Sequence, residues 1–294
     1  MSGNVKWLNY GKSTDYQCQK RCKKTSFAFY QAVRDLRPVW VLEDMRIMEV
    51  LHWEEGGKVS SYTPSEALLY ALVHDHQPYA QYLLSSFPRD ALAMPSINFH
   101  CCQSPAPHLA MAVRYNRVGI LLRILKTMAA LPDSQRVGYL DRRGCQPVES
   151  GQTPLHLACE LLHPECLILL LGHGASPSIV DANGNTPLDT LLQHIGRSQR
   201  DLRCKLLCLE ALSLFLPEQV QFSSKQQLQA NEMFWRERLG RSLFRWLSGQ
   251  CPPSLFTRSM QVLIRSIPLA RFPEALDELP LPALLKPWDL KWKH

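Results

Sequence analysis

Two segments of the chain repeat one another at a fixed distance. The run TPLHLA starts at Thr153, and a second Thr-Pro-Leu run starts 33 positions later at Thr186. Both open with a hydroxyl residue and a proline, which suit a helix start because the hydroxyl caps free amides and proline has no N–H to leave unsatisfied. A unit of this length cannot bury its apolar face alone, so several copies have to stack. The spacing predicts an elongated, all-α protein.

The rest of the better-preserved unit has a second helix and a tight turn. Apolar residues run from Cys166 to Leu171 and stop at Gly172-His173-Gly174, where glycine permits the left-handed backbone that ends helices. The sequence Asp181-Ala182-Asn183-Gly184 then suits a sharp turn. Motif and period together resemble the ankyrin repeat family. This resemblance implies a solenoid of helix pairs with projecting fingers, and a role in binding other proteins.

Weaker copies extend the pattern on both sides. Residues 107–113 and 119–125 form one pair of expected helices, followed by a finger at 141–144 that insertions have enlarged. Residues 67–71 and 79–84 keep the same two-helix spacing upstream, and Thr186 begins a last unit whose second helix is expected at about 202–216. The expected organisation is a disordered basic leader (1–24), an N-terminal helical cap (25–62), about four repeats (63–218), a connecting helix (219–251) and a C-terminal module (252–294).

Charge and hydropathy narrow the class of protein. The net charge is +7, of which residues 1–24 carry +5 (six Lys/Arg against Asp15) and residues 252–294 carry +2 (six against four). Residues 25–251, between these two segments, therefore have no net charge, which argues against a basic nucleic-acid-binding face. No export signal is apparent at the start, so we expect a cytosolic protein. Residues 91–113 lack charge, but their prolines and polar residues indicate a loop rather than a membrane span.

The cysteines and histidines favour packing over chemistry. Cys159 and Cys166 fall at inward positions of repeat helices, and Cys204 and Cys208 share one helix face, so all four are expected in the core. The pairs Cys18/Cys22 and Cys101/Cys102 lack the partner spacing of structural zinc. His74, Asp75 and His76 are expected in a solvated turn, and His108 and His156 near helix caps. We find no motif for a catalytic centre, a metal or a cofactor.

The last forty residues carry a second pattern. Pro252-Pro253-Ser254 precedes an amphipathic helix in which Leu255, Ser259 and Leu263 share one side. Farther on, alternate prolines forbid a helix and keep the backbone extended. That extended segment consists of Leu279, Pro280, Leu281 and Pro282.

These two segments resemble a SOCS box, the module that joins adaptors to cullin-type ubiquitin ligases. The resemblance implies that the helix contacts Elongin C through Ser254, Leu255, Ser259 and Leu263, and that Leu279 to Pro282 contact cullin-five. Ser259 departs from the family, which has cysteine there, and a hydroxyl should fill that apolar site less well. From residues 26–35 to the Pro-Leu-Pro tail, the whole chain also resembles one family of ankyrin repeat domain-containing proteins.

The resulting hypothesis is a non-catalytic substrate receptor of an Elongin B/C–cullin-five ligase. Its target protein would contact arginine and tyrosine side chains on a helix turn and on the enlarged finger, because such residues dominate protein interfaces. These candidates are Arg114, Tyr115, Arg117, Arg142 and Arg143. The alternative is an ankyrin scaffold whose tail is only a hydrophobic cap. A helix at 233–247, rich in aromatic residues, would join tail and stack, and a helical segment around Pro38 would cap the other end.

Overall fold

The computed structural model describes residues 27–47, 62–95, 107–144, 150–198, 200–217 and 219–280. Within these ranges all regular structure is helical, which confirms the all-α prediction. The chain divides into two compact units, Met1–Gln103 and Ser104–His294. None of the described helices is long and apolar enough to cross a membrane.

The first unit contains two short helices followed by a helix pair. Residues 27–34 and α2 (Val39–Ile47) flank Pro38 as expected, with Val33 and Leu42 buried, although Phe27 is 61% exposed. The pair α3 (Pro64–His74) and α4 (Gln77–Ser86) has the two-helix spacing of the repeats, and the short α5 (Pro88–Ala91) follows.

The expectation of a solvated His74–His76 turn is wrong for His76. Only 4% of His76 is exposed. Its Nδ1 accepts from the backbone N–H of Tyr79 at 3.3 Å, and Nε2 lies 2.9 Å from the Arg37 carbonyl oxygen. His76 is therefore the N-cap of α4 and a link to the segment before α2, a structural role.

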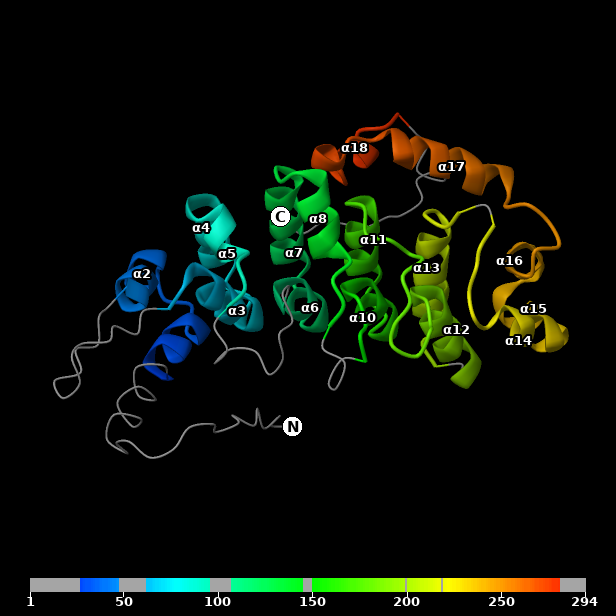
Figure 1. Ribbon diagram of the computed structural model, residues 1–294, viewed down its shortest axis with the longest axis horizontal. Helices are drawn as coiled ribbons and strands as arrows, with labels where there is room; N and C mark the ends of the chain where they lie inside the picture. Colours follow the sequence, from blue (N-terminus) through cyan, green and yellow to red (C-terminus); the bar gives the residue numbers. More distant parts are fainter. Residues whose placement is uncertain are drawn as a thin grey trace. The chain divides into compact units, whose positions relative to one another are not determined.

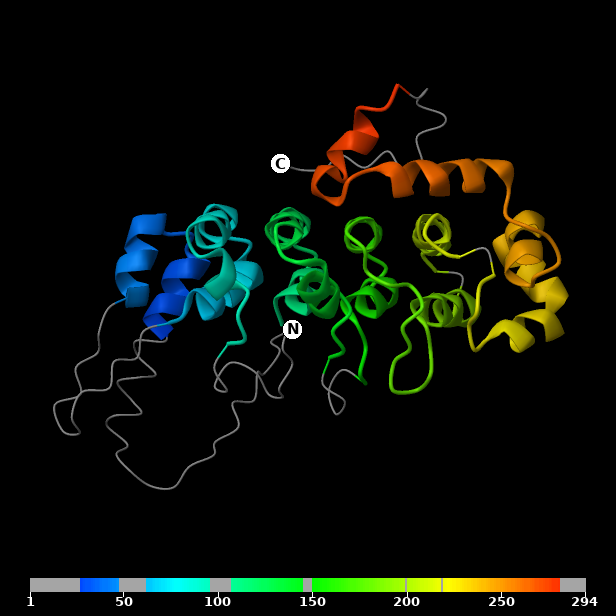
Figure 2. The same ribbon diagram turned by 45° about the horizontal axis from the view of Figure 1, so that its top comes forward.

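The second unit is a stack of three helix pairs, seen end to end in Figures 1 and 2. The first helices of the pairs lie in one layer and the second helices in another. The first layer consists of α6 (Pro107–Arg114), α10 (Pro154–Glu160) and α12 (Pro187–Arg197). The second layer consists of α7 (Val118–Ala129), α11 (Pro164–Gly172) and α13 (Leu202–Ser213). An added helix, α8 (Asp133–Leu140), occupies the insertion before the enlarged finger.

The repeat motif works through its caps. Thr153 caps α10, and the His156 ring returns the bond by accepting from the Thr153 N–H at 3.2 Å. The other ring nitrogen of His156 lies 3.0 Å from the Asn185 carbonyl oxygen in the next finger. His156 lies at a helix cap as predicted, and it also ties that helix to the following repeat. Burial lowers its pKa, so the ring stays neutral. Thr186 and Asp189 form the equivalent capping box on α12.

Two of the four cysteines expected in the core also join neighbouring repeats. Cys159, Cys166 and Cys208 are fully buried. The Cys166 thiol donates to Asn116 Oδ1 at 3.4 Å, and the half-buried Cys204 donates to the Leu162 carbonyl at 3.3 Å, each in the turn of the preceding pair. Burial raises the pKa of Cys166 to about 12, so this thiol stays protonated and unreactive. Cys18, Cys22, Cys101 and Cys102 lie outside the described residues.

The prediction of one connecting helix is wrong. Three short helices replace it: α14 (Lys225–Ala230), α15 (Glu232–Leu239) and α16 (Arg241–Leu247). Gly240, with φ of 79°, separates the last two, a backbone conformation that favours glycine. Trp235, Phe244 and Trp246 are buried as expected, whereas Met233 is 87% exposed.

Candidate functional site: the returning tail

The tail does not extend away from the stack. After α16 the chain turns back and α17 (Leu255–Ser266), a 3₁₀ turn (Leu269–Arg271) and α18 (Glu274–Asp277) cross the second layer of helices (Figure 1). In Figure 2 these orange and red elements lie over α13, α11 and α7. The tail therefore crosses all three pairs of the second unit.

Three contacts hold the tail to the stack. The Gln261 side-chain amide donates to the carbonyl oxygens of Ser213 at 3.0 Å and Leu216 at 3.2 Å, which are backbone acceptors at the end of α13 and just after it. Glu274 forms an ion pair with Lys126 on α7, and this partner lowers the carboxyl pKa despite the opposing effect of burial. These polar contacts fix both ends of the tail along the stack.

The third contact is Phe272, which inserts between the other two. Only 1% of Phe272 is exposed, and its ring meets that of His173 edge to face with centroids 5.8 Å apart. It also lies directly on Gly172, where a Cβ atom would stand 2.0 Å from ring carbon Cε1. Gly174, with φ of 98°, has the left-handed backbone that follows the end of α11, whereas Gly172 still has helical backbone angles and does not need glycine for its conformation. Gly172 therefore leaves room for Phe272.

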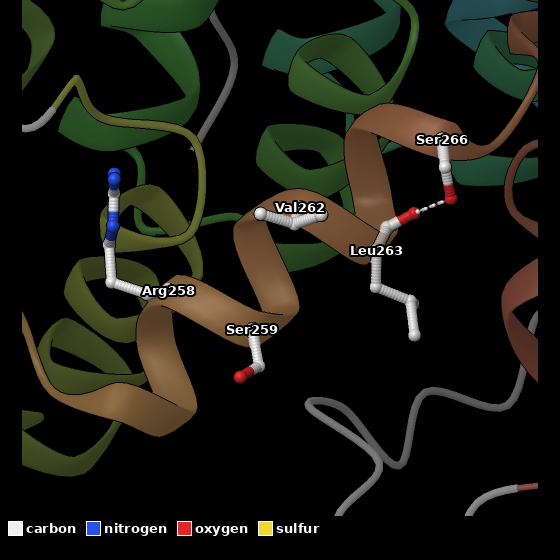
Figure 3. A pocket seen from close by; sticks show the side chains of 5 residues that line it. All are labelled: Arg258, Ser259, Val262, Leu263 and Ser266. Carbon is white, nitrogen blue, oxygen red and sulfur yellow. Dashed lines mark hydrogen bonds between the residues drawn. The ribbon is translucent and has the colours of Figure 1, made fainter.

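Helix α17 has two faces with different surroundings. Met260, Gln261 and Ile264 are buried against the stack. Leu255 is 83% and Val262 65% exposed, Ser259 is exposed and Leu263 is half-buried. Ser259 and Leu263 point the same way from the helix in Figure 3. With Arg258, Val262 and Ser266 they line a shallow depression of about 510 Å³.

The cap of α17 agrees with the sequence. Ser254 has the extended backbone of an N-cap, and its hydroxyl accepts from the Thr257 N–H at 3.1 Å. The i, i+4 spacing thus places Leu255, Ser259 and Leu263 along one side of α17, with Ser254 capping its start and Leu263 half-buried. Leu279 is half-buried and Pro280 exposed after α18, while Leu281 and Pro282 lie outside the described residues.

The residues expected to contact a target lie on two separate elements. Arg114 and Tyr115 are exposed at the turn between α6 and α7, where the Arg117 guanidinium is 5.9 Å from the Tyr115 ring centroid. Arg142 and Arg143 are exposed in the finger that follows α8. Asp141, which precedes them, accepts from the Ser176 N–H at 2.8 Å.

Sequence reasoning missed the residues that fix the tail and one pocket beside α12. Gln261 was visible as a polar residue on the apolar face of α17, and Phe272 as an aromatic residue before a proline. Nothing in the sequence connected Phe272 with Gly172, which lies one hundred positions earlier. Among the described residues, no cluster of three potential metal ligands occurs.

Comparison with known proteins agrees with this architecture. A family profile for ankyrin repeats, three copies, matches residues 109–211, the helix pairs of the second unit. Ankyrin repeats are protein-interaction modules that are generally non-catalytic. Short segments also resemble the yeast (Saccharomyces cerevisiae) Target of rapamycin complex 2 subunit AVO2, 39% identical over 56 residues that make up 19% of this chain and 12% of that protein. The BTB/POZ domain and ankyrin repeat-containing protein NBCL of Lotus japonicus is 48% identical over 42 residues, 14% of this chain and 9% of that protein.

One relative is similar over nearly its whole length. Mouse Ankyrin repeat domain-containing protein 9 is 52% identical over 300 aligned positions, covering 94% of this chain and 92% of the mouse protein. The likeness therefore includes the N-terminal segment and the returning tail as well as the repeats. The chain belongs to the family of ankyrin repeat domain-containing protein 9.

Proposed function

We propose that this protein is the substrate-recognition subunit of an Elongin B/C–cullin-five RING ubiquitin ligase. Its repeats would hold a target protein, and its tail would bring that target to the ligase for ubiquitin transfer and proteasomal degradation. The receptor would act through proximity, by raising the effective concentration of target lysines near the loaded conjugating enzyme. We expect the protein to act in the cytosol, where the buried thiols would stay reduced.

The observation that carries the proposal is the division of α17 into two faces. The buried face is already used by the stack, through Met260, Gln261 and Ile264. The opposite face presents Leu255 and Leu263, the side that the SOCS-box resemblance assigns to Elongin C. A partner could therefore bind the helix without removing it from the stack.

Binding of purified Elongin B/C to immobilised full-length chain tests this role. Leu255→Ala should weaken binding by about 2 kcal/mol, or roughly 30-fold in Kd, because an exposed leucine would become a buried anchor. Ser259→Cys should strengthen binding by restoring a better apolar fit. Met233→Ala is the matched control, since Met233 is an equally exposed apolar residue on α15. Equal binding by wild type and Leu255→Ala would exclude this face.

The cullin contact needs its own measurement. Changing Pro280 and Pro282 together to alanine should leave Elongin binding intact and reduce capture of cullin-five by the preformed Elongin complex, because the extended backbone is lost. If that double variant captures cullin-five as well as wild type does, the segment has another role.

A scaffold without any ligase link is the second candidate. Insertion of Phe272 and the Gln261 hydrogen bonds favour it, because they give the tail a structural purpose in the monomer. If the protein is only a scaffold, no substitution on the exposed face of α17 should change the binding of Elongin B/C.

A further inference from the structure

A pocket of about 440 Å³ lies between the last repeat and the helices that follow it. Its residues come from α12 on one side and from α14 and α15 with their flanking residues on the other. The lining consists of Leu192, Gln193, Gly196, Arg197, Ser224, Gln227, Asn231, Phe234 and Trp235. The volume is within the usual range for ligand and side-chain pockets.

The floor of this pocket is apolar and firmly held. Leu192 and Trp235 are buried, and the Trp235 ring lies so close to Gly196 that a Cβ there would be 3.3 Å from it. Phe234 forms a wall and stays 40% exposed. The Arg238 guanidinium stacks on Phe234, 4.3 Å from the ring centroid. A large apolar side chain from a partner would find a preformed surface here.

Among the described residues that line the pocket, the one charged side chain is positive. Arg197 is exposed on its rim, and among the described lining residues none carries a carboxylate. The carbonyl groups at the end of α12, which would repel an anion, already have cationic partners. Lys205 Nζ donates to the His194 and Ser198 carbonyls at 2.9 Å each, and Arg238 donates to the Ile195 carbonyl at 2.6 Å.

Side-chain amides complete the rim, and those of Gln193, Gln227 and Asn231 line the same space. Gln193 donates to Asn185 Oδ1 and Asn231 to the Gln227 carbonyl, each at 3.3 Å, which leaves each NH₂ group a second hydrogen. The Ser224 hydroxyl donates to the Asp189 carboxylate. Side-chain amides can bond an extended peptide backbone, which needs both donors and acceptors.

From these features we propose that the pocket binds an acidic linear segment of a partner protein. A carboxylate of that segment pairs with Arg197, and a neighbouring apolar side chain packs on Phe234 and Trp235. The site is distinct from Arg114, Tyr115, Arg117, Arg142 and Arg143. Binding of the segment does not depend on the proposed ligase role; only its ubiquitylation would.

A displayed library of random twelve-residue peptides, selected on the full-length chain, tests the proposal. Enriched peptides should carry Asp or Glu next to Leu, Ile, Phe or Met. Synthetic copies, labelled for fluorescence anisotropy, should lose roughly tenfold or more in affinity with Arg197→Glu and keep it with Arg203→Glu, an exposed arginine on α13 outside the pocket. Affinity should also fall with added salt.

Three results would overturn the proposal: no enrichment, enrichment without acidic residues, or peptides that bind Arg197→Glu as tightly as wild type. Elongin binding distinguishes this inference from the proposed function. Arg197→Glu should leave Elongin B/C binding unchanged, and Leu255→Ala should leave peptide binding unchanged.

Discussion

Substitution of Gly172 by alanine tests whether Phe272 determines how the tail is held. Helix propensity alone predicts a gain, because alanine is better than glycine inside a helix by about 0.5–1 kcal/mol. The structure instead predicts that this substitution lowers the free energy of unfolding. The new Cβ would lie 2.0, 2.3 and 2.4 Å from three carbons of the Phe272 ring.

The expected loss follows from the room available to that ring. Carbon atoms in contact lie about 3.5–4 Å apart, so the ring must move by about 1.5 Å or leave its site. Phe272 is 1% exposed, so other groups enclose the ring and oppose that movement. Losing a buried phenylalanine costs about 3–5 kcal/mol, so after the helical gain we expect Gly172→Ala to destabilise by about 2–4 kcal/mol.

A double-mutant cycle isolates this effect. Urea unfolding of wild type, Gly172→Ala, Phe272→Ala and the double variant should show that Gly172→Ala becomes neutral or stabilising once Phe272 is gone. Hydrogen exchange across α17 and α18 should rise in both single variants. Gly138→Ala is the control, because a Cβ on that α8 glycine would have no atom within 4 Å and the variant should gain stability. If Gly172→Ala raises stability while Phe272 is present, the packing argument is refuted.

Three further outcomes follow from buried polar groups. Gln261→Leu should cost about 1–3 kcal/mol in urea unfolding, because two carbonyls lose their donor; an unchanged midpoint would contradict this. Burial alone would raise the pKa of Asp189, but hydrogen bonds, led by the one from Ser224, lower it. Asp189→Asn should therefore destabilise the fold by about 2–4 kcal/mol at pH 7 and by less at pH 3, which thermal unfolding of wild type and variant at both pH values can check. Burial lowers the pKa of four histidines below the unfolded value of about 6.5, so the unfolded chain binds more protons than the folded chain in this pH range. The urea concentration at the unfolding midpoint should therefore decrease as the pH is lowered from 7.5 to 5.5, and an increase would be inconsistent with neutral rings. Those four are His156, His163, His173 and His194.

The repeats could be predicted from sequence because their signals are local. Thr153 and Thr186 cap helices only a few residues away, and the finger turn at Asp181 closes on Asn183 and Asn185. Each interaction spans fewer residues than one unit, so the order of residue types was enough to identify it.

The docking of the tail could not be predicted in the same way. Gly172 fitted the ordinary pattern of a glycine near a helix end, and its contact with Phe272 depends on how distant segments fold together. The break at Gly240 was a local signal that the prediction of one connecting helix passed over. The exposed side of α17 was predictable from spacing, but its buried side depended on backbone acceptors at Ser213 and Leu216.

The returning tail changes how the second unit should unfold. In an ordinary repeat array each unit touches only its neighbours, so stability is a chain of nearest-neighbour terms and the ends can fray independently. Here Glu274 reaches back to Lys126 across 148 positions, and Phe272 joins the tail to the middle pair. Local unfolding of the last repeat would therefore disturb the contacts that the tail makes with the first and middle helix pairs. During synthesis the repeats emerge before the tail that spans them, so these contacts between tail and repeats form only after α17 and α18 have left the ribosome.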